Sequence, residues 1–311
     1  MLKHFTEFGL NTYAEYLFLT QQDSLEKLSQ EDLKDIPCHI YVIGRKPRVS
    51  LDHKTFSIDE NWVKGTLKFR QEDYVESRDF ILPNRLGNHN LRLECPYPYS
   101  EFSLWDVNGK CFSSAKAGLL AHLSPKMEGL TDFEVLYIGQ AYGNQGSRKA
   151  TDRLQSHSTL QAIYHEVSTR SPDQEVWLLL LNFEAALYTI FNGQEKYFKT
   201  TQEEDDIHLN NVLETGITEQ QAINFTEAAL IRYFEPEFNE IFKNTFPDPV
   251  HRTYSECYEL DINSVMVTIE TEDIRSRLWS QRRAKSWCHI ASFALHGTED
   301  RKSLFDIMSS I

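Results

Sequence analysis

Four residues of this chain have side chains suited to hydrolysis of a phosphodiester bond. Tyr137 ends an apolar run, Arg153 and His157 are four residues apart, and Glu227 lies in a later segment with helical periodicity. An arginine offers a planar fork that matches phosphate, and an imidazole can accept a proton near neutral pH. A carboxylate is a ligand for Mg²⁺ or Mn²⁺, which activate water and stabilise a departing oxygen. Together these residue types indicate a metal-dependent nuclease site.

The helix that holds Glu227 is predicted to begin at Thr218, because Thr218 and Gln221 have the spacing of a capping box, and to end before Pro236. Glu227 shares one stripe of this helix with Ile223, Leu230, Ile231 and Phe234. The carboxylate therefore faces the sheet, where its burial must be compensated. A bound metal ion would compensate it, and so would a salt bridge to a neighbour, which helix geometry alone favours.

The elements that must position these side chains alternate between strand and helix from about residue 100 to 247. Hydrophobic patterns predict strands at residues 101–107, 133–139 and 176–183, a helix at residues 152–167 and the helix from Thr218. On a single helix, Arg153 and His157 would project from one face. This order predicts an α/β fold with a small, mainly antiparallel three-stranded sheet flanked by helices.

Three domains are predicted. Residues 1–97 form an N-terminal mixed α/β domain for recognition or partner binding, with helical spacing at about residues 11–35 and strands near 39–43 and 62–69. Pro96 and Pro98 mark its end, because proline does not suit a central strand. Residues 98–247 form the core that carries the site. Residues 248–311 form a C-terminal extension with strands near 264–270 and 288–295.

Composition limits the partners of the chain. Its 311 residues are 41% hydrophobic, an ordinary globular composition, but 32 Lys and Arg against 46 Asp and Glu give a net charge of −14. Any contact with DNA must therefore be local. No signal peptide is evident and the longest apolar run, residues 176–181, is too short to cross a bilayer, so we expect a cytoplasmic protein without membrane contact. Five dispersed cysteines indicate neither a disulfide framework nor a zinc site.

Two basic segments are candidates for that local contact. The first also contains Trp279 and Trp287, so it could combine phosphate contact with base stacking, and it comprises Arg275, Arg277, Arg282, Arg283 and Lys285. The alternative is an ordinary solvated face, which is the more common role of a charge run. The second is Arg148 and Lys149, which follow a glycine-containing turn at residues 143–147.

The strings Tyr137-Ile138-Gly139, Arg153 to His157, and Glu227 to Asn239 resemble the GIY-YIG nuclease family. In that family a strand ends in YIG, the next helix carries Arg with Tyr or His four residues later, and a later helix carries the metal-binding Glu, with Asn twelve residues after it. The separations here are four and twelve. The resemblance covers only the central part of the chain.

The resemblance implies a role for each matching residue. Glu227 would hold one Mg²⁺ or Mn²⁺ ion, Arg153 would stabilise the scissile phosphate, Tyr137 would position or deprotonate the attacking water, and His157 would assist as a base or phosphate contact. Gly139 and Asn239 would support the site structurally, with Asn239 pinning the loop behind the helix that carries Glu227.

The chain also departs from the family pattern. No Gly-Ile-Tyr string precedes Tyr137, and we expect the strand that should hold it at residues 101–107, about 25 residues before the YIG strand. The first catalytic tyrosine is thus unassigned. Gln140 stands where many members have Lys.

The sequence therefore predicts a divalent-metal-dependent DNA endonuclease, and the habit of the family favours bacterial defence against foreign DNA. Because the overall charge is acidic, activity would require a particular DNA structure, a protein partner or a homo-oligomer. Two alternatives remain. One is a non-catalytic module that binds nucleic acid or protein, and the other is a protein–protein adaptor that works through the acidic run at residues 203–206 and the aromatic N-terminal domain.

Overall fold

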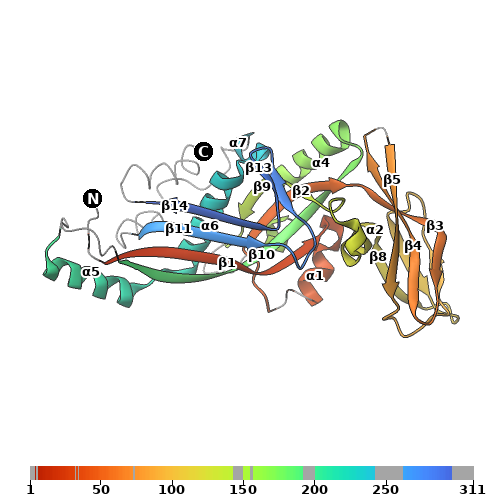
Figure 1. Cartoon of the computed structure of the whole chain (residues 1–311), viewed down its shortest axis with the longest axis horizontal. Helices are drawn as coiled ribbons and strands as arrows, with labels where there is room; N and C mark the ends of the chain where they lie inside the picture. The colour runs from red at the N-terminus through yellow and green to blue at the C-terminus, as the bar shows by residue number, and fades with distance from the viewer. Residues whose placement is uncertain are drawn as a thin grey trace.

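The structure is a computed structural model of the chain, and it describes residues 4, 6–31, 33, 35–72, 74–142, 150–154, 157–191, 200–241 and 262–295. The molecule is elongated (Figure 1). A large sheet forms its body, two smaller sheets lie at one end, and helix α5 (Gln202–Thr215) lies at the other.

The body is one mixed sheet of eight strands in the order β13-β12-β9-β2-β10-β1-β11-β14. Its members are β1 (Thr6–Thr20), β2 (Ile40–Pro47), β9 (Phe133–Gln140), β10 (Gln174–Phe191), β11 (Ile262–Glu270), β12 (Leu278–Ser280), β13 (Arg283–Ser286) and β14 (Cys288–Ala294). The pairs β1 with β11 and β9 with β12 are parallel, and the other pairs are antiparallel.

The prediction of a small three-stranded sheet flanked by helices is therefore wrong. Strands β9, β2 and β10 are adjacent and antiparallel, but β1, β11 and β14 extend the sheet on one side and β12 and β13 on the other. The added strands come from residues 6–20 and 262–294, at opposite ends of the chain. Local hydrophobic patterns contain no information about pairing over such separations, which is why the sheet was underestimated.

Strand β1 also corrects the helix predicted over residues 11–35. Tyr13, Tyr16 and Leu17 have helical spacing, yet the segment pairs with β10 from Thr6 to Thr20. Among the described residues of that segment, the helical ones belong to the 3₁₀ turn η1 (Gln22–Ser24) and to α1 (Leu25–Glu31). Pairing with the central strand β10, whose residues 176–181 are all buried, overrides the local spacing.

The two smaller sheets form what we call the β domain, which comprises β3 to β8 and the following helix α2. Strands β3 (Val49–Ile58), β4 (Trp62–Gln71) and β5 (Tyr74–Pro83) make one sheet, and β6 (Arg92–Glu94), β7 (Glu101–Trp105) and β8 (Cys111–Lys116) make another. Helix α2 (Ala117–Leu123) follows β8, and the 3₁₀ turn η2 (Pro125–Met127) leads toward β9. Residues 101–105 thus form a strand of the β domain, and the prediction that they belong to the same sheet as β9 is wrong.

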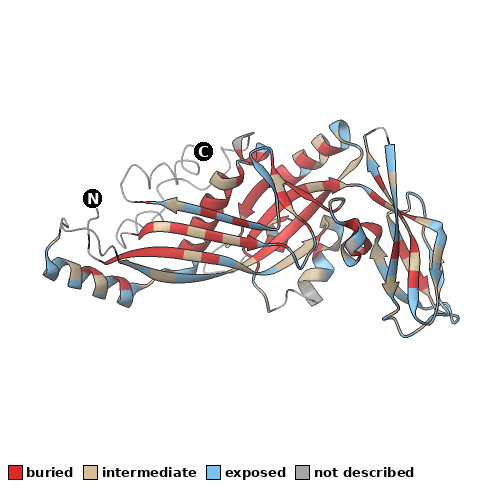
Figure 2. Ribbon diagram, in the orientation of Figure 1, coloured by how far each residue is buried: buried red, intermediate tan, exposed pale blue. Residues whose placement is uncertain are grey.

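Helices cover both faces of the large sheet. Helix α6 (Glu219–Phe234) packs on one face, against β9, β11 and β14, and forms a core cluster that includes Ile138, Leu179 and Val265. Helices α3 (Ala150–Leu154) and α4 (Ser158–Arg170) and the short α7 (Glu237–Ile241) belong to the other cluster, with Tyr41 and Leu180. Figure 2 shows the buried residues concentrated in these central strands and in α6.

The predicted domains are distributed over this architecture. Residues of the N-terminal segment 1–97 supply β1 and β2 to the large sheet and β3 to β6 to the β domain. The described strands of the C-terminal segment 248–311 belong to the same large sheet as the predicted core. Among the described helices, none is long and apolar enough to span a membrane.

Candidate active site

The candidate site is built around Tyr41, a residue of β2 that the sequence analysis did not select. Tyr41 pairs with Gly139 across β2 and β9, and Tyr137 lies two residues earlier on β9, so the two tyrosine rings stand near each other with centroids 6.2 Å apart. A Cβ atom at Gly139 would lie 2.5 Å from the Tyr41 hydroxyl oxygen. Glycine is therefore needed there for Tyr41 to lie against the strand.

Arg153 and His157 converge on the hydroxyl of Tyr41. Arg153 Nε donates a hydrogen bond to this oxygen at 3.0 Å, and His157 Nε2 lies 2.8 Å from it. His157 Nδ1 accepts a hydrogen bond from the backbone N–H of Leu160, so the proton of the neutral ring is on Nε2. The imidazole therefore also donates to Tyr41, and two donors meet at one phenol oxygen.

The two residues do not share a helix, as the prediction of one helix over residues 152–167 required. Arg153 lies in the last turn of α3, and His157 is the N-cap of α4. Helix α3 ends at Leu154, and a separate helix α4 begins at Ser158, because His157 has extended backbone angles and its ring caps α4. This arrangement brings both heads to the same phenol from two helices.

Glu227 lies on the buried face of α6, as its spacing predicts, and helix α6 has the predicted capping box of Thr218 and Gln221. Its carboxylate is fully buried, and neither oxygen has a hydrogen-bond partner among the described residues. Burial raises the pKa of Glu227 to about 8, and the nearby Arg153 guanidinium and the polar groups of Gln140 oppose this shift without cancelling it. The salt bridge that helix geometry favoured is not formed within the described part of the chain.

Burial also affects the two phenols. It raises the pKa of Tyr41 well above its usual range, and the proximity of Tyr137 adds to the rise, whereas Arg153 opposes it. The pKa of Tyr137 is raised by burial and by the charge of Glu227, with Arg153 again opposing. Arg153 itself is half-buried, and the charges of these phenols and of Glu227 help to keep it protonated by raising its pKa. These four side chains therefore influence one another's ionisation.

Asn239 holds the backbone of the YIG strand. Its side-chain oxygen accepts from the N–H of Ile138 at 2.9 Å, and its amide donates to the carbonyl of Ile138 at 2.9 Å. Helix α6 ends at Phe234, and Glu235 takes the left-handed conformation just before Pro236. The chain then turns back into α7, so that Asn239 fixes the position of β9 relative to the end of α6.

The basic segment of β12 and β13 is largely engaged within the protein. Arg277 forms two hydrogen bonds of 2.8 Å with the buried carboxylate of Asp132, and Lys285 lies 3.0 Å from the same group. Arg275 donates to the carbonyl of Leu123, and Arg283 donates to that of Tyr233. Arg282 makes an exposed contact of 3.3 Å with Glu235. Arg148 and Lys149 lie outside the described residues.

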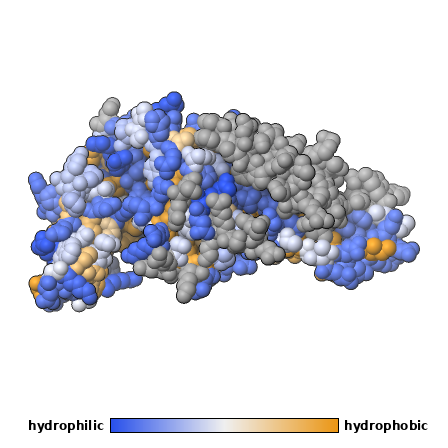
Figure 3. Space-filling view, turned by 180° about the vertical axis from the view of Figure 1, so that it is seen from behind, coloured by the Kyte–Doolittle hydropathy of each residue, from blue (hydrophilic) through white to orange (hydrophobic). Residues whose placement is uncertain are grey.

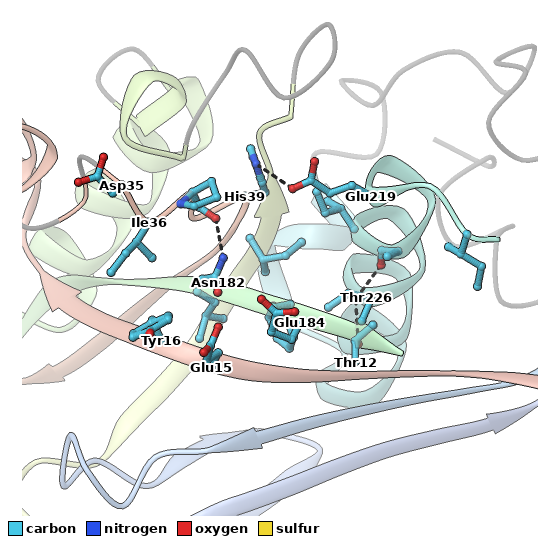
Figure 4. A pocket seen from close by; sticks show the side chains of 18 residues that line it. Thr12, Glu15, Tyr16, Asp35, Ile36, His39, Asn182, Glu184, Glu219 and Thr226 are labelled. Atoms are coloured by element: carbon cyan, nitrogen blue, oxygen red, sulfur yellow. Dashed lines mark hydrogen bonds and ion pairs between the residues drawn. The ribbon is translucent and has the colours of Figure 1, made fainter. Parts of the chain in front are cut away.

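A cavity of about 500 Å³ lies between β1, β10 and the first turns of α6 (Figure 4). Its lining contains the carboxylates of Glu15, Asp35, Glu184 and Glu219 but no lysine or arginine among the described residues. His39 lies 3.8 Å from Glu219 and also contacts the carbonyl of Ala141, just past β9. Four carboxylates repel phosphate, so this cavity does not suit a DNA backbone.

The carboxylate of Glu227 is a type of ligand that Mg²⁺ prefers, and this side chain is fully buried and lines neither of the two large cavities. Its two oxygens lack partners in the described part of the chain, and Mg²⁺ is commonly held by one or two carboxylates together with waters and substrate oxygens. Within the same residues no group of three or more His, Cys, Asp or Glu side chains is placed to hold a metal. Glu227 is thus a candidate for a single protein ligand and not part of a larger ligand set among the described residues.

Comparisons of the chain with family models, with curated proteins and with solved structures found no match. The four residues selected from the sequence, Tyr137, Arg153, His157 and Glu227, are brought into one region around the tyrosine that the sequence analysis missed. The sequence does contain an indication of Tyr41, because the string His39-Ile40-Tyr41 ends in Ile-Tyr, like the Gly-Ile-Tyr string of the GIY-YIG family. Because residues 1–97 are predicted to form a separate domain, the sequence does not indicate that Tyr41 pairs with the YIG strand.

Proposed function

We propose that the chain is a divalent-metal-dependent nuclease that hydrolyses phosphodiester bonds in DNA, with an active site formed by Tyr41, Tyr137, Arg153, His157 and Glu227. One observation carries this proposal: Arg153 and His157 both donate to the Tyr41 oxygen beside a buried carboxylate that lacks a hydrogen-bond partner in the described residues. The motif resemblance to GIY-YIG nucleases supports it, with Tyr41 in the role of the missing first tyrosine.

Tyr41 is the base in this proposal. As a phenolate it takes a proton from the water that attacks phosphorus, and the hydrogen bonds from Arg153 and His157 stabilise its negative charge. The bond between phosphorus and the leaving oxygen breaks as the new bond forms. Since burial raises the pKa of Tyr41, only a small fraction is ionised at neutral pH, and the rate of hydrolysis should rise with pH through the alkaline range.

Arg153 and Glu227 serve the phosphate. Arg153 uses Nε for Tyr41, and its terminal nitrogens can contact a non-bridging phosphate oxygen. Glu227 would hold a Mg²⁺ or Mn²⁺ ion, which, when bound, would polarise the phosphodiester and stabilise the leaving oxygen. His157 keeps its proton on Nε2 because Nδ1 caps α4, so it orients Tyr41 and is not the base.

The test is incubation of the purified chain with supercoiled, linear and single-stranded DNA in Mg²⁺, Mn²⁺ or EDTA. We expect Tyr41→Phe, Arg153→Ala and Glu227→Gln each to reduce metal-dependent cleavage by about 10²-fold or more. Tyr74→Phe and Glu219→Gln are matched controls, since Tyr74 is 57% exposed on β5 and the Glu219 side chain is 59% exposed on the same helix as Glu227. Both controls should cleave like the unmodified protein.

Two outcomes would overturn the assignment. Metal-dependent cleavage that survives Tyr41→Phe and Glu227→Gln would place the active site elsewhere. Absence of cleavage of every DNA form by folded protein, together with unchanged thermal stability on addition of Mg²⁺ or Mn²⁺, would favour a non-catalytic module.

A further inference from the structure

A second cavity, of about 510 Å³, opens into the β domain away from the candidate active site. Ten of its lining residues are apolar: Phe56, Val63, Leu82, Pro83, Leu86, Phe102, Leu104, Ala115, Leu120 and Leu123. They come from both small sheets and from helix α2, so the cavity lies within the core of the β domain. Figure 3 shows apolar patches among hydrophilic ones over this end of the molecule, at the left of that view. Its size and lining are those of a small-molecule site.

Two guanidinium groups stand among the polar residues of this lining. Arg85 is exposed, and neither Arg85 nor Arg275 forms a salt bridge with a described carboxylate. Arg275 donates one N–H group to the carbonyl of Leu123 and has others left. The one lining carboxylate, Asp273, also has no ion pair in the described residues. The charged groups of the lining therefore sum to one positive charge on a chain of net charge −14.

The remaining lining groups do not alter this charge. His122 donates from Nδ1 to the carbonyl of Ile274 at 2.6 Å, and its Nε2 contacts the buried Lys46 amine. Burial and the neighbouring Lys46 charge lower the pKa of His122 far below its usual value, so its ring is neutral. Ser113 contributes only a hydroxyl.

We propose that this cavity binds a small amphipathic organic anion, with its hydrocarbon body between the two small sheets and its anionic group at Arg85 and Arg275. The apolar lining favours an aliphatic or aromatic body, since burial of apolar surface drives such binding. Guanidinium groups recognise carboxylate, sulfonate and phosphate alike through charge-assisted hydrogen bonds. A nucleotide fits less well, because its sugar and base would place many polar atoms against walls with few partners.

The occupant would touch an element connected to the active site. Arg275 ends the turn between β11 and β12, and its carbonyl accepts a hydrogen bond from Thr131, just before β9. Strand β12 then pairs directly with β9, the strand that carries Tyr137. A ligand held by Arg275 therefore contacts a segment hydrogen-bonded to the entry of that strand, which makes the cavity a candidate effector site.

The test is calorimetric titration of the full chain with decanoate and with decyltrimethylammonium, both below their micellar concentrations. We expect decanoate to bind at least about tenfold more tightly, because only its carboxylate gains hydrogen bonds from arginine. Arg85→Gln should weaken decanoate binding about threefold to tenfold, and Arg275→Gln should act similarly. Arg78→Gln is the matched control, since Arg78 contacts Glu76 on β5 and does not line the cavity.

Ala115→Phe places a ring in the cavity while both arginines remain, so it should abolish binding. Circular dichroism verifies that each variant is folded. If Arg275→Gln and Ala115→Phe are not folded, the result for Arg85→Gln decides the test. The proposal is overturned if decanoate does not bind, if the two amphiphiles bind equally, or if Arg85→Gln binds decanoate as the unmodified chain does. None of these measurements uses DNA cleavage, so the result is independent of the proposed nuclease activity.

Discussion

At the scale of single residues, the candidate site contains buried polar groups whose burial costs free energy, and neighbouring side chains compensate only part of this cost. Glu227 is buried without a hydrogen-bond partner among the described residues, and Tyr41 and Tyr137 are buried phenols. Such groups cost free energy in the folded protein unless a ligand completes their interactions. This pattern is common at active sites, where residues are arranged for a reaction and not for stability.

The burial of Glu227 predicts a pH-dependent stability of the metal-free protein. Its pKa is raised to about 8 in the folded state, so its contribution to stability is fully present below its ordinary, unfolded-state pKa and is lost as pH rises through about 8. Glu227→Gln cannot ionise and should become increasingly more stable than the unmodified protein over this range, by at most about 5 kcal/mol.

Urea unfolding in EDTA from pH 5 to 9 measures this difference. Glu219→Gln, at an exposed position of the same helix, should show no comparable trend. Addition of Mg²⁺ should reduce the difference in unfolding free energy between Glu227→Gln and the unmodified protein at high pH, because a cation would stabilise the ionised carboxylate. If the difference in stability between Glu227→Gln and the unmodified protein does not change with pH, the assigned burial of Glu227 is contradicted.

Gly139→Ala is predicted to displace Tyr41. The added Cβ would lie 2.5 Å from the Tyr41 hydroxyl oxygen and 2.6 Å from its Cζ, so the ring must move. We expect a loss of about 1–3 kcal/mol of stability and a loss of DNA cleavage of about 10²-fold, since the catalytic hydroxyl would be misplaced.

Gly109→Ala provides the control for Gly139→Ala. Gly109 has a φ of 75° and no atom within 4 Å of an added Cβ, so that variant is strained in its backbone but lies far from the site in the β domain. It should lose stability and retain cleavage. Equal cleavage by Gly139→Ala and the unmodified chain would argue against Tyr41 as the base.

At the scale of elements, the start of a separate helix α4 after α3 allows both Arg153 and His157 to contact Tyr41. Because α4 begins at His157, the ring that caps the helix also contacts Tyr41. The sequence predicts the four-residue spacing of Arg153 and His157 but not this start of a separate helix, since the intervening residues have no strong helix-breaking signal. The same sequence did predict α6, its capping box and the buried position of Glu227, because all three follow from local periodicity.

The double role of His157 can be separated by substitution. His157→Asn keeps a side chain that caps α4 but cannot reach Tyr41 in the same way, so its stability should stay within about 0.5 kcal/mol while cleavage falls. His157→Ala removes both interactions and should also lose about 1 kcal/mol of stability. Urea unfolding and DNA cleavage measure the two effects, and full cleavage by His157→Asn would show that the contact with Tyr41 is dispensable.

At the scale of the whole molecule, residues from the two ends of the chain belong to the same sheet as the strand that carries Tyr137. Strands β1 and β11 pair with each other in parallel, and β12 pairs with β9. The sequence predicts five of the eight strands of this sheet, but the sheet depends on which strands pair, and so does the position of Tyr41 beside the YIG strand. Pairing between residues 100 or more positions apart is decided by tertiary packing, which a single sequence does not display.

The ion pair of Arg277 with Asp132 is predicted to stabilise this assembly more than it contributes to DNA contact. Asp132 is only 5% exposed, so Arg277→Gln should lower the free energy of unfolding by about 2–4 kcal/mol. Arg282→Gln, at a pair whose side chains are 70% and 53% exposed, should change it by less than about 1 kcal/mol. Denaturant unfolding compares the two, and equal stabilities would mean that Arg277 is free to serve another partner.

The β domain is inserted between two strands of the large sheet, β2 and β9. Arg45 near the end of β2 and Glu134 near the start of β9 are register partners joined by a salt bridge of 2.6 Å, although the whole β domain lies between them in sequence. It is thus an insertion at the tip of a hairpin whose two arms carry Tyr41 and Tyr137. A change in the length or sequence of that insertion therefore leaves the register of the two arms, and with it the alignment of Tyr41 and Tyr137, in place.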